Sequence, residues 1–87
     1  MIITVQQAHY LDNYRLQLVF NTGETGTADL QDIIFNYQAA LPLREIIQFK
    51  TFKLDEWSTV VWDCGFDISP ETLYERATGK TVAWLHN

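Results

Sequence analysis

A cysteine, a serine and several carboxylates lie close together in the stretch VWDCGFDISPETLY. A thiolate at Cys64 could act as a nucleophile, provided that a base such as His9 or His86 approached it in the fold. The carboxylates of Asp63 and Asp67 could instead form the acid and base pair of glycoside hydrolysis, if burial separated their pKa values. Either arrangement would make the protein a small hydrolase.

A purely structural interpretation explains the same residues. Asp63 and Asp67 flank Gly65, where aspartate is common in turns, and both favour the neutral thiol at Cys64. Two distant histidines and one cysteine have no recognisable zinc-ligand spacing, so no metal or other cofactor is expected. The structural interpretation is preferred, and no catalytic residue is assigned.

The residues after this turn predict a short helix. Ser69 is a typical N-cap, Pro70 suits the first helical position, and Glu71 faces the positive end of the helix dipole. The helix is expected to run to about Ala77 and to stop near Gly79, which suits a left-handed C-terminal cap.

Alternating apolar residues predict an antiparallel three-stranded meander at the N-terminus. Its strands are residues 2–8, 14–20 and 25–30, with turns at residues 11–13 and 21–24. One face of the second strand is expected to be apolar, and it carries Tyr14, Leu16, Leu18 and Phe20.

The rest of the chain predicts shorter elements. Asp29 is expected to cap a helical turn over residues 31–35, and Pro42 to open a helix over residues 42–49. Residues 52–62 indicate a hairpin. The fold class is therefore α+β, a single domain over residues 1–87 with a small antiparallel sheet of about five or six strands and two or three short helices.

The charge distribution limits the partners. The net charge is −5, and six of the eleven acids fall between residues 55 and 75, a stretch without Lys or Arg. Direct nucleic-acid binding is not expected, because phosphate contacts need clustered cations. The six acids are Asp55, Glu56, Asp63, Asp67, Glu71 and Glu75.

The cysteine content and the N-terminal residues bear on localisation. A single cysteine and an N-terminus without a basic start or apolar run predict a cytoplasmic protein. No stretch approaches the ~20 apolar residues that a membrane-spanning helix needs.

Two apolar features could contact partners. Trp57 lies among polar residues at a hairpin tip and either anchors a partner or folds back onto the sheet. The tail of residues 80–87 carries Val82, Trp84 and Leu85, which predict an extra strand on the protein's own sheet edge or on a second copy as a homodimer contact.

The spacing of these motifs resembles domain-of-unknown-function family 2442 (DUF2442), a small bacterial domain, over about residues 8–76. The family pattern joins F-x-(D/N)-G-E, x-D-L, P-L and a closing W-x-x-G-x-D-I-x-P-E-x-L-Y. The chain carries it as Phe20, Gly23, Glu24, Asp29, Leu30, Pro42, Leu43, Trp62, Gly65, Asp67, Ile68, Pro70, Glu71, Leu73 and Tyr74. Relatives tend to have Pro-Asn where this chain has Asp63-Cys64.

The resemblance implies an α+β domain of no established activity, in some relatives fused to a helix-turn-helix domain. It also implies a neighbouring gene for another small protein, in the manner of toxin and antitoxin pairs. The preferred hypothesis is a non-enzymatic interaction module, antitoxin-like, whose acidic face binds a small basic protein. The alternative is the small hydrolase that uses Cys64 or the pair of Asp63 and Asp67.

Overall fold

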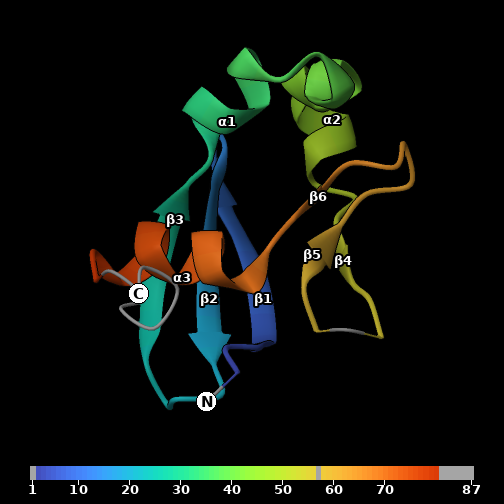
Figure 1. Ribbon diagram of the computed structural model, residues 1–87. Coiled ribbons are helices and arrows are strands. Elements are labelled where there is room, and N and C mark those ends of the chain that lie inside the picture. The colour runs from blue at the N-terminus through green and yellow to red at the C-terminus, as the bar shows by residue number, and fades with distance from the viewer. Residues whose placement is uncertain (1, 57, 81–87) are drawn as a thin grey trace.

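The N-terminal half of the chain forms the expected three-stranded antiparallel meander (Figure 1). The computed structural model describes residues 2–56 and 58–80. Strands β1 (Val5–Asp12), β2 (Arg15–Phe20) and β3 (Thr25–Asp29) lie in the order β1-β2-β3, with β2 in the centre. The alternation of β2 is confirmed, because Leu16, Leu18 and Phe20 are fully buried.

The first strand differs from the prediction in its position. It begins at Val5 and continues through Asp12, which was expected to lie in the turn. Asn13 makes the turn instead with a φ of 43°, a conformation that asparagine tolerates better than most residues. Arg15 then binds back to Asp12 across the hairpin at 2.6 Å, which holds the carboxylate at the end of the strand.

Three short helical elements follow β3 and lie above one end of the meander (Figure 1). They are α1 (Gln31–Asn36), the 3₁₀ helix η1 (Gln38–Arg44) and α2 (Ile46–Phe49). The expected cap at Asp29 is displaced by one residue: Leu30 is the N-cap, while a carboxylate oxygen of Asp29 accepts a hydrogen bond from the Gln31 amide at 3.0 Å.

The predicted helix over residues 42–49 is wrong. Pro42 lies inside η1, and Glu45 is extended, with a ψ of 122°, so the helix breaks before α2. The buried residues of η1 explain the difference: Ala40 and Leu43 are three apart, the repeat that a 3₁₀ helix places on one face. The sequence spacing predicts an α-helix, but it fits the tighter 3₁₀ turn as well.

The strands of the C-terminal half form a second sheet. Strands β4 (Lys53–Leu54), β5 (Val60–Val61) and β6 (Asp67–Ile68) pair antiparallel in that order, so the expected hairpin has a third strand that was not anticipated. The amide of Val5 donates to the carbonyl of Ser58 at 2.9 Å. This bond links the start of β1 to the β4–β5 turn and joins the two sheets.

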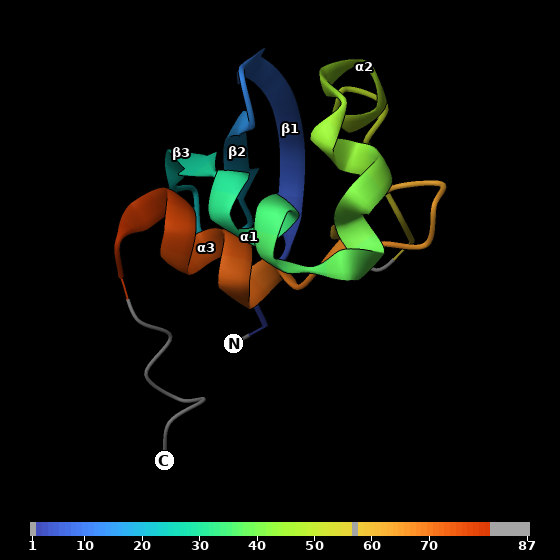
Figure 2. The same ribbon diagram turned by 90° about the horizontal axis from the view of Figure 1, so that it is seen from above.

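The last helix, α3 (Pro70–Thr78), has both predicted caps. The Ser69 side chain accepts from the Thr72 amide, and Gly79 adopts a left-handed conformation with a φ of 75°. The helix lies across one face of the meander, as both views show (Figures 1 and 2). Within the described ranges no helix is long and apolar enough to cross a bilayer.

The approach of α3 to the meander is closest at Gly26. A Cβ atom on Gly26 would lie 2.2 Å from the backbone oxygen of Ala77, in the last turn of the helix. Such a distance is far inside van der Waals contact, so any residue other than glycine at position 26 would push the helix away. Gly26 therefore determines how deeply α3 settles on the sheet.

A polar clamp secures the same end of α3. The Tyr74 hydroxyl donates to Glu24 in the β2–β3 turn at 2.6 Å, and Lys80 contacts the other oxygen of that carboxylate at 2.6 Å. Lys80, Tyr74 and Thr22 together lower the pKa of Glu24 to about 2. The carboxylate therefore favours the folded protein as long as it stays ionised.

We expect Gly26→Ala to lower the free energy of unfolding by about 2 kcal/mol or more, because the backbone carbonyl of Ala77 cannot rotate away as a side chain would. Urea unfolding followed by circular dichroism measures this loss. Gly23→Ala is the reference: it has open space around the new methyl group and only a backbone penalty at a φ of 89°. An equal or smaller loss at Gly26 would contradict the close contact.

Glu24→Gln should lower the melting temperature at neutral pH and flatten its decline in acid. The folded pKa of Glu24 lies below its ordinary value, so its stabilisation is complete above about pH 4.5 and disappears as the pH falls towards 2. Thermal unfolding between pH 7 and 2 tests this, with Glu56→Gln in an exposed turn as the control. Parallel curves for the wild type and Glu24→Gln would argue against the clamp.

Candidate functional site

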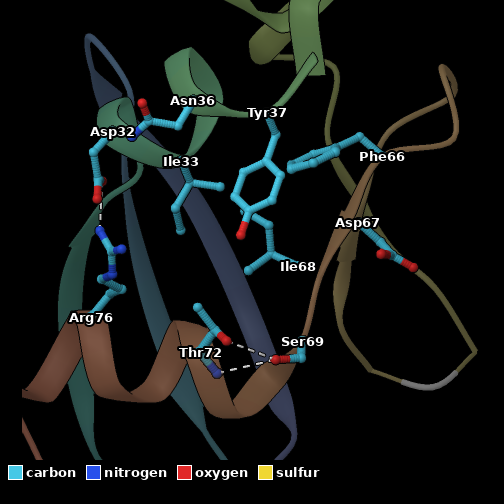
Figure 3. Close-up of a pocket in the computed structure, with 10 residues that line it drawn as sticks. All are labelled: Asp32, Ile33, Asn36, Tyr37, Phe66, Asp67, Ile68, Ser69, Thr72 and Arg76. Atoms are coloured by element: carbon cyan, nitrogen blue, oxygen red, sulfur yellow. Dashed lines mark hydrogen bonds and ion pairs between the residues drawn. The ribbon is translucent and has the colours of Figure 1, made fainter. Parts of the chain in front are cut away.

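A hollow on the described surface lies between α1 and the junction of β6 with α3 (Figure 3). Its volume is about 510 Å³, and its lining includes the aliphatic side chains of Ile33 of α1 and Ile68 of β6. Both isoleucines are buried and belong to the core. The hollow is therefore a place where the hydrophobic core approaches the surface.

Two aromatic rings form one side of this hollow. Tyr37 is 59% exposed, and its ring centroid lies 6.3 Å from that of Phe66. Phe66 in turn contacts Trp62 at 5.9 Å, and the Trp62 indole donates to the carbonyl of Phe49 at 2.8 Å. The rings at the surface are thus continuous with buried aromatic residues, which restricts their movement.

An ion pair forms the opposite side. Arg76 of α3 contacts Asp32 of α1 at 2.5 Å, as Figure 3 shows. A second hollow of about 650 Å³, which includes Asp29 and Phe35, shares both residues of this pair and Asn36 with the first. The two hollows therefore meet at the ion pair, and we refer to them together as the α1–α3 groove.

The electrostatics of the groove are dominated by carboxylates. The hydrogen bond from Arg76 holds the pKa of Asp32 below its usual range, while Asp32 and, to a lesser extent, Asp29 raise the pKa of Arg76. Asp67 lies at the outer rim, and its carboxylate points away from the ring of Tyr37 (Figure 3). Three aspartates thus line the groove with one arginine.

Ser69, which is part of the closely spaced polar stretch, has a structural role. Its hydroxyl donates to the Thr72 hydroxyl at 2.9 Å and accepts from the Thr72 amide at 3.3 Å, as expected of an N-cap. Both side chains lie along the edge of the groove next to α3 (Figure 3).

Cys64 and Asp63 lie on the turn between β5 and β6. Cys64 is exposed, and Lys53 contacts the carboxylate of Asp63, itself 80% exposed, at 2.7 Å. Gly65 supports the turn with a φ of 96°. Over residues 2–56 and 58–80 no three His, Cys, Asp or Glu side chains converge as metal ligands would.

The predicted acidic residues are distributed over separate parts of the fold. Asp55 and Glu56 lie in the β4–β5 turn, where Asp55 accepts a hydrogen bond from the Thr59 amide at 3.1 Å. Asp63 follows β5, so it lies at the opposite end of that strand from the turn with Asp55. Lys53 also gives Asp63 a cation that the sequence run did not contain.

The other residues predicted to contact partners lie on β6 and α3 or outside the described residues. Asp67 of β6 lines the α1–α3 groove, whereas Glu71 and Glu75 lie on α3 and are not among the residues that line it. Trp57 and the tail residues lie outside the described residues, and the contacts predicted for them stay predictions. The tail residues are Val82, Trp84 and Leu85.

Sequence reasoning missed most of the groove. Asp32 and Arg76 are 44 residues apart, and Tyr37 comes from a different element than Phe66, so neither pair has a local spacing signal. Tyr37 is a large aromatic residue directly after a short helix, which was the one available indication. The groove offers apolar surface, two rings and an ionic rim, features that suit binding of a peptide-like ligand.

Comparison with known proteins identifies relatives but no activity. Residues 5–79 match the model of the family described as protein of unknown function (DUF2442), so the predicted resemblance is confirmed over a slightly longer range. Among curated proteins, none matches the chain significantly.

One solved structure is similar to this fold: the putative DNA binding protein NE0471 from Nitrosomonas europaea, with a TM-score of 0.77 and 25% sequence identity. The alignment covers 91% of this chain and 51% of that protein. This chain therefore spans about half the length of its structural relative.

Breaking the ion pair at the groove should leave the fold intact. Both side chains are partly exposed, so a double-mutant cycle of Asp32→Asn and Arg76→Gln should give a coupling free energy of at most about 1 kcal/mol. Urea unfolding of the four proteins measures it. A coupling of several kcal/mol would instead make the ion pair a main support of the helix packing.

Proposed function

This chain belongs to the DUF2442 family, and we propose that it is a non-enzymatic module that binds a basic protein. The proposal rests mainly on how the chain uses its cations. It holds six Lys and Arg residues in all, against eleven acids. The excess of acids leaves a net charge of −5, and a cation that has a partner within the protein is less available to bind an anion.

All six cations have such partners. Four of them contact carboxylates, which leaves two that use neutral groups. Arg44 donates to the backbone carbonyls of Ile34 and Phe35, and Lys50 lies 5.3 Å from the ring centroid of Tyr10. The four ion pairs are Arg15 with Asp12, Lys53 with Asp63, Arg76 with Asp32 and Lys80 with Glu24.

This use of cations bears on the DNA-binding description of NE0471. Phosphate binding depends on Lys and Arg side chains that are free to displace counterions. The six cations here are dispersed and engaged, and the chain corresponds to about half of NE0471. We therefore do not extend DNA binding to this chain, and any DNA role of the protein would be indirect.

A binding role also fits the polar residues that first suggested chemistry. Cys64 is exposed, Asp63 is held by Lys53, and Ser69 serves as an N-cap. A nucleophile or general base would need a neighbour that activates it or a buried site that shifts its pKa. These positions support a structural role for the stretch, and no specific observation favours the hydrolase alternative.

The partner's chemistry follows from the charge. A protein of net charge −5 meets a basic partner faster at low salt, because the opposite fields guide the encounter. Together with the family resemblance, this supports an antitoxin-like role in which the chain binds and occupies a small basic protein. Of the predicted acidic run, Asp67 lines the groove, and Asp67 and Glu71 are the proposed electrostatic contacts.

The immobilised full-length chain should retain a basic protein from an extract of its source cells at about 0.05 M salt and release it at about 0.5 M. Mass spectrometry identifies the protein, which is then purified and mixed with the chain to confirm a complex of fixed stoichiometry. Retention of only acidic proteins, or of none at low salt, would overturn the proposal.

A charge-matched comparison separates specific from general attraction. A variant with Asp67 and Glu71 changed to their amides should bind the identified partner more weakly and with less salt dependence. The control changes two other acids, Glu45 and Glu56, both exposed and neither of them lining the groove, to their amides. It removes the same charge, and its affinity should fall less.

A further inference from the structure

We infer that the α1–α3 groove is the docking site for the partner, and that its occupant is an extended basic segment with an Arg or Lys side chain over the Tyr37–Phe66 ring pair. The inference rests on the proposed function and adds the place and the chemistry of the contact. Tyr37 and Phe66 line the first hollow, while Phe35, which is 44% exposed, lines the second. Aromatic surface is thus present at both ends of the groove.

The charge of the groove selects the occupant. The aspartates at positions 29, 32 and 67 and the single Arg76 give it a formal charge of −2 (three negative, one positive). Arg76 is bound to Asp32, so an incoming anion would have to compete with a carboxylate already in place. A cationic side chain would instead be attracted by the net negative charge of the groove and its rim.

The ring pair gives the cation a defined place. An Arg or Lys head over an aromatic face is attracted by the ring quadrupole, and the aliphatic part of the side chain can lie against apolar surface. Ile33 and Ile68 provide that surface beside Tyr37 (Figure 3). The protein already uses this interaction internally: Arg44 lies 5.3 Å from the ring centroid of Phe35.

The rings are also held ready for binding. Phe66 packs on Trp62, and the Trp62 indole is fixed by its hydrogen bond to the Phe49 carbonyl. Trp62 and Phe49 are buried, so the outer rings rest on a fixed base. A partner that binds here loses little free energy in ordering the site.

The test uses the full chain and a defined peptide, acetyl-Ala-Arg-Leu-Arg-Ala-amide, with the same peptide carrying citrulline in place of both arginines. Citrulline keeps the shape but lacks the charge. Amide chemical-shift mapping should place the arginine peptide against residues 32–37, 66–69 and 72–76, while the citrulline peptide should bind at least about five-fold more weakly.

Two variants and two matched controls locate the contact. Tyr37→Ala should weaken the arginine peptide about five-fold, whereas Ile47→Ala, at a 78% exposed apolar position on α2, should have no effect. Asp67→Asn should weaken it further than Glu56→Gln, which removes the same charge from the distant β4–β5 turn. Circular dichroism checks that every variant is folded.

The outcomes separate this inference from the proposed function. If the identified partner binds the combined Tyr37→Ala and Asp67→Asn variant as tightly as the wild type, the groove is not the docking site, although the binding role stands. Failure of the arginine peptide to bind, or its binding elsewhere on the chain, overturns the inference in the same way. Failure to find any basic partner overturns the proposed function itself.

Other occupants of the groove would also be detected. A dimer seen by sedimentation that Tyr37→Ala dissociates would assign the groove to a second copy of the chain. A variant that ends at Lys80 and binds the peptide much more tightly than the full chain would assign it to residues 81–87. Either result overturns the inference.

Discussion

The packing of α3 on the meander is the constraint on which the rest of the structure depends. At Gly26 the helix and β3 touch backbone to backbone, so the depth of the helix is set by the absence of a side chain. This placement brings Arg76 to Asp32 and lets the start of α3 form one side of the groove. The position of the α3 side of the groove therefore depends on a glycine on β3 that permits this approach.

The same helix end shows how the protein uses its few cations. Lys80 and the Tyr74 hydroxyl both bind Glu24, so the C-terminal end of α3 is fastened to the β2–β3 turn by polar contacts as well as by packing. Surface ion pairs of this kind contribute little stability each. Their further consequence is that the paired cations are less available to an external anion, while the net charge of −5 stays the same.

The elements that were predicted from the sequence are those with local signals. Alternation was enough for β2, and the caps at Ser69 and Gly79 fixed both ends of α3. The 3₁₀ helix was not predicted because Leu43 and Ile46 are three residues apart. Both α-helices and 3₁₀ helices place residues with this spacing on one face over a single turn, so the spacing does not distinguish them. Strand β6 is only two residues long and depends on its pairing with β5. No local sequence pattern indicates such a pairing, so the strand was not predicted.

The candidate site was harder to predict because its contacts are not local. The acidic run suggested one negative face, but strand topology places Asp55 and Asp63 at opposite ends of β5. Of the acidic run only Asp67 lines the groove, together with aromatic rings from the α1–η1 junction and the β5–β6 turn. Charge alone attracts any basic protein, whereas Tyr37 and Phe66 can bind a cation only where their faces are open. In the proposed complex the aromatic residues would provide the selectivity that an acidic surface by itself lacks, and the buried Trp62, which packs on Phe66, would link this selectivity to the folded core.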